Sequence, residues 1–158
     1  MSFKGIQRSF KYNQINYGNI GDVFPLLCPE RELDWLDGWE YKMIHSNTGI
    51  IEKDCVFTTT FKEHSETVWQ VTQYDKTNYI IEFLRVTPFE NVAKINIQLN
   101  KISEKKTEAI IEYRYTALNE DQNTFIKTNL EQIFIESMKW WEKSINYYLE
   151  TGNKLIKK

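Results

Sequence analysis

The chain has 158 residues, enough for one domain with a sizeable core and too few for two ordinary domains, so we expect a single domain over residues 1–158. Its 20 basic and 22 acidic residues are interspersed and give a formal net charge of −2, which argues against nucleic acid as a partner. Aromatic residues make up 15% of the chain, more than a minimal core needs, and surplus aromatic surface often lines a pocket.

The first predicted element is a strand over residues 5–13, in which apolar and polar side chains alternate. Two short helices are expected next. One covers residues 19–27, and the other begins at Pro29 and ends at Gly38. Six further segments alternate with period two and are separated by short turns, which is typical of an antiparallel meander. These segments are residues 39–46, 53–61, 66–74, 78–87, 90–100 and 107–118.

A single long helix is predicted after the last strand, over residues 119–150. Asn119 followed by Gln122 is a typical N-terminal cap, and Gly152 marks the expected end. A helix of this length is not stable alone, so its apolar face must lie on the sheet. That face consists of Ile126, Leu130, Ile133, Phe134, Trp141, Ile145 and Tyr148.

This order of elements resembles the START-like helix-grip (SRPBCC) superfamily, which groups polyketide cyclases and dehydratases, lipid-transfer domains and plant pathogenesis-related proteins. The resemblance covers nearly the whole chain. It is sharpest at VFPLLCPERELDWLDGW, GIIEKDCVFTT, VWQVTQYD and YIIEFLRVTP, which are similar to a prokaryotic subgroup with the signature CPxRExxWxxGW. The resemblance implies an α+β fold. A curved, seven-stranded antiparallel sheet would grip the C-terminal helix around an apolar ligand cavity, and the two short helices would close one end.

The apolar phase of the strands and of the long helix predicts which side chains line this cavity. The predicted ligand-binding residues are Trp39, Tyr41, Met43, Trp69, Ile81, Phe83, Arg85, Ile95, Ile97, Ile111, Tyr113, Leu130, Phe134 and Trp141. The gate that the resemblance implies at the short helices consists of Phe24, Leu27, Cys28 and Trp35. The alternative is a solid core without a void, because aromatic stripes also build ordinary cores.

Two arginines, Arg8 and Arg85, share the phase of the inward apolar residues. A buried guanidinium needs a carboxylate or a ligand anion, because its desolvation otherwise costs several kcal/mol. Glu32 or a ligand head group could supply that charge. The alternative is that both arginines lie near sheet ends and extend to water.

His45 also falls on the inward phase and is the candidate catalytic residue, a general base for an aldol-type cyclisation or a dehydration. The alternative is a structural or solvated histidine, and His64 in the turn KEHS is a weaker candidate. Cys28 precedes a helix N-terminus that could lower its thiol pKa, but it could equally be a small buried residue at a tight junction. No Ser/His/Asp order, HExxH or glycine-rich phosphate loop is present in the sequence.

Cys28 and Cys55 lie far apart without a CxxC spacing, so we expect no metal, no cofactor and no disulfide. No apolar run is long enough to span a bilayer, and the segment MSFKGIQRSF does not resemble a secretory signal. We therefore expect a cytoplasmic protein, a monomer or homodimer, that does not insert into membranes.

Three functions are compatible with this pattern. The first is non-catalytic binding or transport of a small hydrophobic or amphipathic molecule, lipid-like or polyketide-like, and the few polar residues on the inward face favour it. The second is an enzyme of cyclase, dehydratase or hydrolase type that uses the same cavity. The third is a chaperone-cofactor role carried by the surface, as in one branch of the superfamily.

Overall fold

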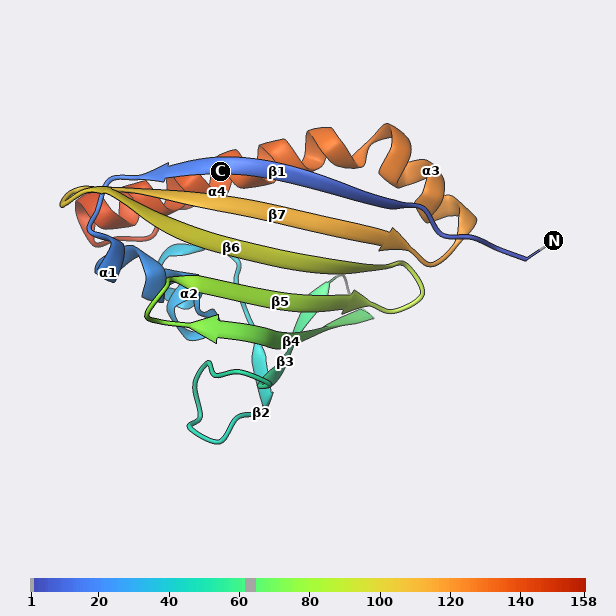
Figure 1. Cartoon of the computed structure of the whole chain (residues 1–158), viewed down its shortest axis with the longest axis horizontal. Coiled ribbons are helices and arrows are strands. Elements are labelled where there is room, and N and C mark those ends of the chain that lie inside the picture. Colours follow the sequence, from blue (N-terminus) through green and yellow to red (C-terminus); the bar gives the residue numbers. More distant parts are fainter. Residues whose placement is uncertain (1, 62–64) are drawn as a thin grey trace.

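A computed structural model describes residues 2–61 and 65–158 (Figure 1). Within these residues, seven strands form one antiparallel sheet in the order β1-β7-β6-β5-β4-β3-β2, and this arrangement confirms the predicted fold class. The strands are β1 (Gln7–Asn16), β2 (Lys42–His45), β3 (Val56–Phe61), β4 (Ser65–Asp75), β5 (Ile80–Thr87), β6 (Asn91–Ser103) and β7 (Lys106–Ala117). The helices are α1 (Ile20–Val23), the 3-10 turn η1 (Phe24–Leu27), α2 (Pro29–Trp35), α3 (Glu120–Thr128) and α4 (Leu130–Thr151).

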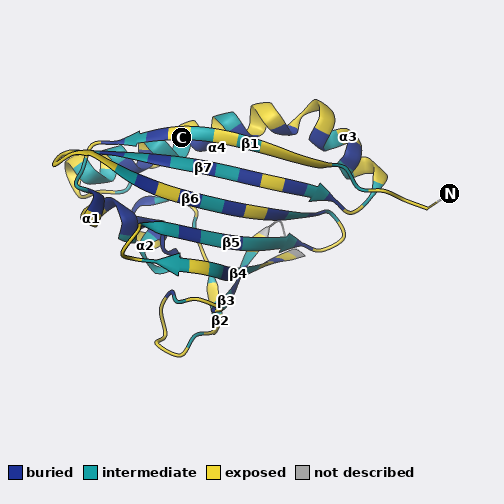
Figure 2. Cartoon of the chain, viewed as in Figure 1, coloured by how far each residue is buried: buried dark blue, intermediate teal, exposed yellow. Residues whose placement is uncertain are grey.

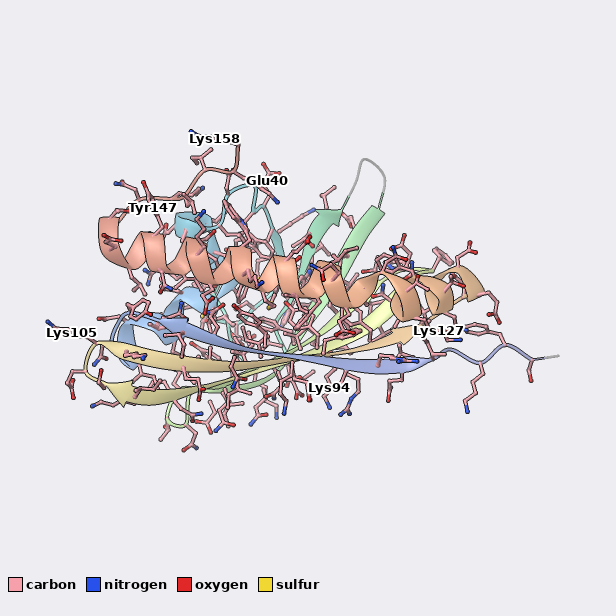
Figure 3. All side chains as sticks on the ribbon, turned by 90° about the horizontal axis from the view of Figure 1, so that it is seen from above. Glu40, Lys94, Lys105, Lys127, Tyr147 and Lys158 are labelled. Atoms are coloured by element: carbon pink, nitrogen blue, oxygen red, sulfur yellow. The ribbon has the colours of Figure 1, made fainter. Side chains whose placement is uncertain are left out.

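The sheet is strongly curved and covers α4 on one side. The short strands β2 and β3 run steeply across the direction of β6 and β7, while α1 and α2 lie at one end of the sheet (Figure 1). Seen from above, α4 lies along the sheet, and side chains from both layers meet between them (Figure 3). None of the described helices is both long and apolar enough to cross a membrane.

The long strands β6 and β7 alternate between buried and more exposed side chains, as Figure 2 shows. Their register pairs Ile95 with Tyr113 and Ile97 with Ile111 across the concave face. Side chains of a strand point to opposite faces in turn, so this register places a continuous row of apolar groups under α4. The predicted period-two pattern is therefore confirmed for these strands.

The C-terminal helix differs from the prediction of one helix over residues 119–150. It is broken at Asn129, whose backbone (φ −123°, ψ −30°) separates α3 from α4. The Thr128 hydroxyl bonds back to the Thr124 carbonyl at 2.8 Å, and Thr and Asn side chains compete with helical backbone hydrogen bonds in this way.

The predicted caps at the two ends of this helical segment are present. The Gln122 amide donates to Asn119 Oδ1 at 2.8 Å, and Gly152 ends α4 with a φ of 73°. A left-handed residue of this kind is a common helix end, and glycine adopts it without steric cost. The interruption at Asn129 is therefore internal, and the predicted limits of the helical segment hold.

Two boundaries at the short helices also differ from the prediction. Residues 19–27 form α1 followed by the 3-10 turn η1, because Pro25 at the start of η1 cannot donate a helical hydrogen bond. Helix α2 ends at Trp35 and not at Gly38, since Leu36 already has an extended backbone (φ −100°, ψ 108°). The predicted strand over residues 39–46 is reduced to the four residues of β2 at the edge of the sheet.

Candidate functional site

A cavity of about 230 Å³ lies between the concave face of the sheet and α4. Its wall is mainly aromatic and aliphatic, with one arginine and one glutamate among the lining residues. From α2 and the segment after it come Glu32, Leu36 and Trp39; from the sheet, Phe57, Trp69, Phe83, Arg85, Ile95, Ile97, Tyr113 and Tyr115; and from α4, Leu130, Ile133, Phe134, Ser137, Met138 and Trp141.

The structure brings most of the predicted ligand-binding residues to this wall. They are Trp39, Trp69, Phe83, Arg85, Ile95, Ile97, Tyr113, Leu130, Phe134 and Trp141. Tyr41, Met43, Ile81 and Ile111 do not line it. Ile81 and Ile111 are fully buried in the core, while Tyr41 and Met43 are partly buried and pack against its edge. All four residues lie on the inward phase of their predicted strands, but the cavity lies at other positions along the sheet.

Several lining residues were missing from the predicted ligand-binding set, namely Glu32, Leu36, Phe57, Tyr115, Ile133, Ser137 and Met138. Two of them carry a signal that could have been used. Phe57 lies on the apolar phase of its predicted strand, and Met138 follows Leu130 and Phe134 at a spacing of four along one helix face.

The four predicted gate residues are all buried, and none of them lines the cavity. Phe24 stacks on Tyr74 with ring centroids 5.8 Å apart. Trp35 is fully buried, donates from Nε1 to the Leu26 carbonyl at 2.8 Å, and packs edge-to-face on Trp141 at 5.2 Å. Trp35 therefore supports the cavity wall from behind, and a gating movement of this end stays a prediction.

Cys28 is also part of this packed end. Its thiol lies 3.8 Å from the Tyr74 hydroxyl, and Cys55 is a second free, buried cysteine. Burial, assisted by the nearby negative charge of Glu30, raises the pKa of the Cys28 thiol to about 12. The alternative of an activated thiolate at the helix N-terminus is therefore wrong, because desolvation dominates at this position.

Arg85 enters the cavity from β5 and lies among three aromatic rings. Its guanidinium carbon is 5.4 Å from the Trp69 ring centroid, 5.7 Å from that of Tyr113 and 5.6 Å from that of Tyr115. Nη2 donates to the Tyr115 hydroxyl at 3.3 Å. Nε is buried and has no hydrogen-bond partner among the residues that the structure describes. Arg8, by contrast, is exposed on the edge strand β1 and lines neither this cavity nor the pocket beside it.

Glu32 lies on α2 and also lines the cavity, with only 6% of its surface exposed. Burial raises the pKa of this carboxyl well above its usual value, and the neighbouring charge of Glu30 adds to the effect. Within the described part of the chain, Glu32 forms no ion pair with Arg85. Burial therefore favours the neutral form of this carboxyl, and Glu32 is not the ion-pair partner that the sequence suggested for Arg85.

The hydroxyl of Tyr113 completes the polar groups of the inner wall. Burial raises the pKa of this phenol, an effect that the positive charge of Arg85 partly opposes. Tyr113 therefore stays protonated at neutral pH and is a hydrogen-bond donor as well as an acceptor.

A second, more polar pocket of about 620 Å³ adjoins the cavity. The two share the lining residues Trp39, Trp69, Arg85, Tyr115, Leu130 and Ile133. The rest of the outer wall is mostly polar: Gly38, Glu40, Thr59, Thr60, Thr67, Thr87, Glu90, Asn91, Gln122 and Phe125. Arg85 thus lies at the boundary between an apolar inner space and a polar outer one.

His45, the predicted general base, is exposed on β2 and lines neither pocket. The strand register shifts between Met43 and His45, so Met43 pairs with the buried Phe57 while His45 pairs with Val56 on the other phase. A bulge of this kind turns the following side chain to the opposite face. The expectation of an inward imidazole is therefore wrong, and His64 lies outside the described residues.

Among the described residues, no group of three or more His, Cys, Asp or Glu side chains is arranged to hold a metal ion. The polar groups of the inner cavity are therefore the Arg85 guanidinium, the Glu32 carboxyl, the Tyr113 and Tyr115 hydroxyls and the Ser137 side chain. These groups can donate hydrogen bonds to a bound molecule, and Arg85 adds a positive charge.

No protein-family model and no curated protein matches the sequence. Norcoclaurine synthase from Thalictrum flavum is similar in structure, with a TM-score of 0.69 at 11% identity over 94% of this chain and 89% of that one. The Zhui aromatase/cyclase from Streptomyces sp. R1128 has a TM-score of 0.68 at 8% identity, over 95% of this chain and 100% of that one. Ara h 8.0201 has a TM-score of 0.63 at 10% identity, over 92% and 99%. The chain therefore has the helix-grip fold that its order of elements predicts.

Proposed function

We propose that the protein binds a small amphipathic molecule in the cavity between the sheet and α4. The observation that carries the proposal is the junction of two unlike spaces, an apolar cavity of about 230 Å³ and a polar pocket of about 620 Å³, which share six lining residues. The inner cavity alone is smaller than most ligand sites, whereas the two together reach the usual size. A molecule with an apolar body and a polar end matches this arrangement.

The structural neighbours support the proposal. Norcoclaurine synthase, with the same fold, has been solved in complex with dopamine and hydroxybenzaldehyde, which are small aromatic molecules with polar groups. The inner wall of the present chain is rich in aromatic rings, including Trp39, Trp69 and Phe83. Such rings offer flat apolar contact area at low cost in side-chain entropy.

Catalysis of the cyclase or dehydratase type is the second candidate function, and one observation favours it. Glu32 is a buried carboxyl at the wall of the cavity, and a carboxyl whose pKa is raised by burial can act as a general acid. Binding is the stronger proposal, because no pair of groups with opposite acid and base roles is in evident hydrogen-bond contact inside the cavity.

A cavity-filling variant tests the proposed function. Ile95 is buried and lines the cavity, so Ile95→Phe should occupy part of the space and weaken binding of a medium-chain fatty acid or a flat polyaromatic molecule by tenfold or more. Leu84 lies on the neighbouring strand, does not line the cavity and points to the opposite face, so Leu84→Phe is the matched control.

Affinity is measured by isothermal titration calorimetry, and the melting temperature of each variant is recorded with and without ligand, since a ligand that binds only the folded state stabilises it. The account predicts saturable binding to the wild type and to Leu84→Phe. Equal affinity of the Ile95→Phe variant, or no binding across the ligand panel, would contradict it.

A further inference from the structure

The hydrogen-bonding capacity of Arg85 is largely unused. A guanidinium carries five N–H donors, and the described hydrogen bond of Arg85 is the 3.3 Å contact to the Tyr115 hydroxyl. Nε is buried without a partner among the described residues. A buried donor without a partner costs free energy, and the cost is larger for a charged group. The geometry therefore leaves donors available for a bound molecule.

The aromatic rings around Arg85 do not remove this requirement. Trp69, Tyr113 and Tyr115 lie 5.4 to 5.7 Å from the guanidinium carbon, a distance at which ring faces attract a cation. This attraction stabilises the positive charge of the guanidinium and limits the movement of the Arg85 side chain. It does not provide acceptors for the N–H groups, which form strong bonds only to oxygens in the guanidinium plane.

No described acid neutralises the charge of Arg85. Glu32 lines the same cavity, but burial favours its neutral form and it forms no ion pair with Arg85. Glu40 and Glu90 line the outer pocket, also without an ion pair with Arg85. Glu82, a near neighbour in sequence, pairs instead with Lys94 at 3.8 Å. The Arg85 guanidinium therefore has no ion-pair partner among the described residues in the absence of a bound molecule.

We propose that the amphipathic molecule is a monocarboxylate whose carboxylate binds Arg85 while its apolar body fills the inner cavity. This proposal rests on the proposed function and specifies its ligand class. The planar fork of a guanidinium matches the two oxygens of a carboxylate, which accept two parallel hydrogen bonds. A single negative charge fits better than the double charge of a phosphate, because Glu40 and Glu90 in the adjoining pocket repel added negative charge.

The position of Arg85 also sets the orientation of the ligand. Arg85 borders both pockets, whereas Phe83, Ile95 and Ile97 line only the inner one. A carboxylate at the boundary therefore keeps access to the polar outer wall, and an alkyl or aromatic body extends toward Met138 and Trp141. Burial also disfavours the charged form of Glu32, which reduces the repulsion between this carboxyl and a bound carboxylate.

Two matched ligands test the proposal on the wild-type protein. One is a medium-chain fatty acid and the other is the primary alcohol of the same chain length, which buries the same apolar body without the charge. Charge-assisted hydrogen bonds predict that the acid binds ten- to a hundredfold more tightly, measured by calorimetry at neutral pH. The alkyl phosphate of the same length is the third ligand, and it should bind more weakly than the acid.

Arg85→Met removes the charge and keeps an apolar side chain of similar length. It should lower affinity for the acid to that for the alcohol and leave the alcohol's affinity within about threefold of the wild type. Arg114→Met is the control, because Arg114 is exposed on β7, separated from β5 by β6, and its register partner on β6 is the exposed Lys94. Circular dichroism and the melting temperature establish that both variants fold.

The outcomes separate the two proposals. If acid and alcohol bind the wild type equally, or if Arg85→Met keeps the preference for the acid, the carboxylate assignment is wrong and the proposed function stands. Tighter binding of the alkyl phosphate overturns the choice of a monocarboxylate. If none of the three ligands binds, both proposals fail. The wild-type comparison alone decides the matter if Arg85→Met does not fold.

Discussion

Trp35 and Trp69 belong to two aromatic regions of the same interior, and the two regions are packed differently. Trp35 is fully buried between α2 and α4, and its indole N–H donates to the Leu26 carbonyl at 2.8 Å. Trp69 borders an open space and faces an arginine whose buried Nε has no described partner. Aromatic density alone therefore does not distinguish a core from a binding site. The proposed binding site differs from the packed region in having a void next to a donor without a described partner.

This difference explains the separate roles of the two ends of the fold. The short helices form a packed wall of fully buried side chains, including Leu26, Leu27 and Trp35, which stabilises the folded state. The centre of the sheet keeps space and an unpaired charge, which reduce stability and favour a ligand instead. Two experiments measure the effect of this contrast on the free energy of unfolding, the larger expected effect first, and a third follows ligand binding at the tryptophans.

The largest effect is expected from two isoleucines that face each other in the register of β6 and β7. Ile111 is fully buried away from the cavity, whereas its partner Ile97 lines it. Ile111→Ala should lower the free energy of unfolding by about 4 kcal/mol, because it creates a new void in a filled region. Ile97→Ala should cost about 2 kcal/mol, since part of its surface already lacks contact atoms.

Both losses in the free energy of unfolding are measured by urea unfolding, without ligand and under the same conditions. Equal losses for Ile97→Ala and Ile111→Ala would mean that the space beside Ile97 is filled in solution. The contrast between the two regions would then be wrong.

A smaller, pH-dependent effect is expected from Glu32. The folded state raises the pKa of Glu32 above the ordinary value of 4.5. Between pH 4.5 and the folded-state pKa, the carboxyl is mostly charged in the unfolded chain and mostly neutral in the folded one, so folding takes up a proton. The wild type should therefore lose stability with rising pH until the folded-state pKa is reached, by about 1.4 kcal/mol per pH unit from this group. Glu32→Gln removes the titration and should become more stable than the wild type as the pH increases.

The stability difference between Glu32→Gln and the wild type, measured in urea at several pH values from 4 upward, checks this sign. Glu150→Gln is the control, because Glu150 is exposed near the end of α4. A difference that does not change with pH would show that the Glu32 carboxyl is solvated and charged, in which case it could neutralise Arg85.

Alternation along the strands predicted much of the concave face, including Ile95 and Tyr113, because the period of a strand is a local property of the backbone. His45 was misplaced because a one-residue bulge in a short edge strand changes the phase without a signal in the sequence. Ile81 was predicted to line the cavity. It lies on the inward face of the sheet, as predicted, but it does not border the void. Local periodicity says which way a side chain points, whereas the location of a void depends on how α4 and the short helices pack on the sheet.

Local periodicity likewise does not predict which charged side chains form ion pairs. The phase of β5 placed Arg85 inside, but whether a carboxylate reaches it depends on the position of α2, which is distant in sequence. Glu32 lines the same cavity without pairing to it, and no sequence pattern distinguishes this arrangement from an ion pair. The break at Asn129 is an intermediate case, because Thr128 and Asn129 are poor helix formers that a closer inspection of propensities would have marked.

The indole N–H resonances of the tryptophans test the central claim most directly, with the smallest perturbation of the protein. Trp39, Trp69 and Trp141 line the cavity, whereas Trp140 does not. During titration with a medium-chain fatty acid, two-dimensional nitrogen–proton NMR should show saturable shifts of the Trp39, Trp69 and Trp141 indoles with one common dissociation constant. The Trp140 indole should stay unchanged. Shifts confined to Trp140, or no saturable shift of the three cavity indoles, would contradict the binding site between the sheet and α4.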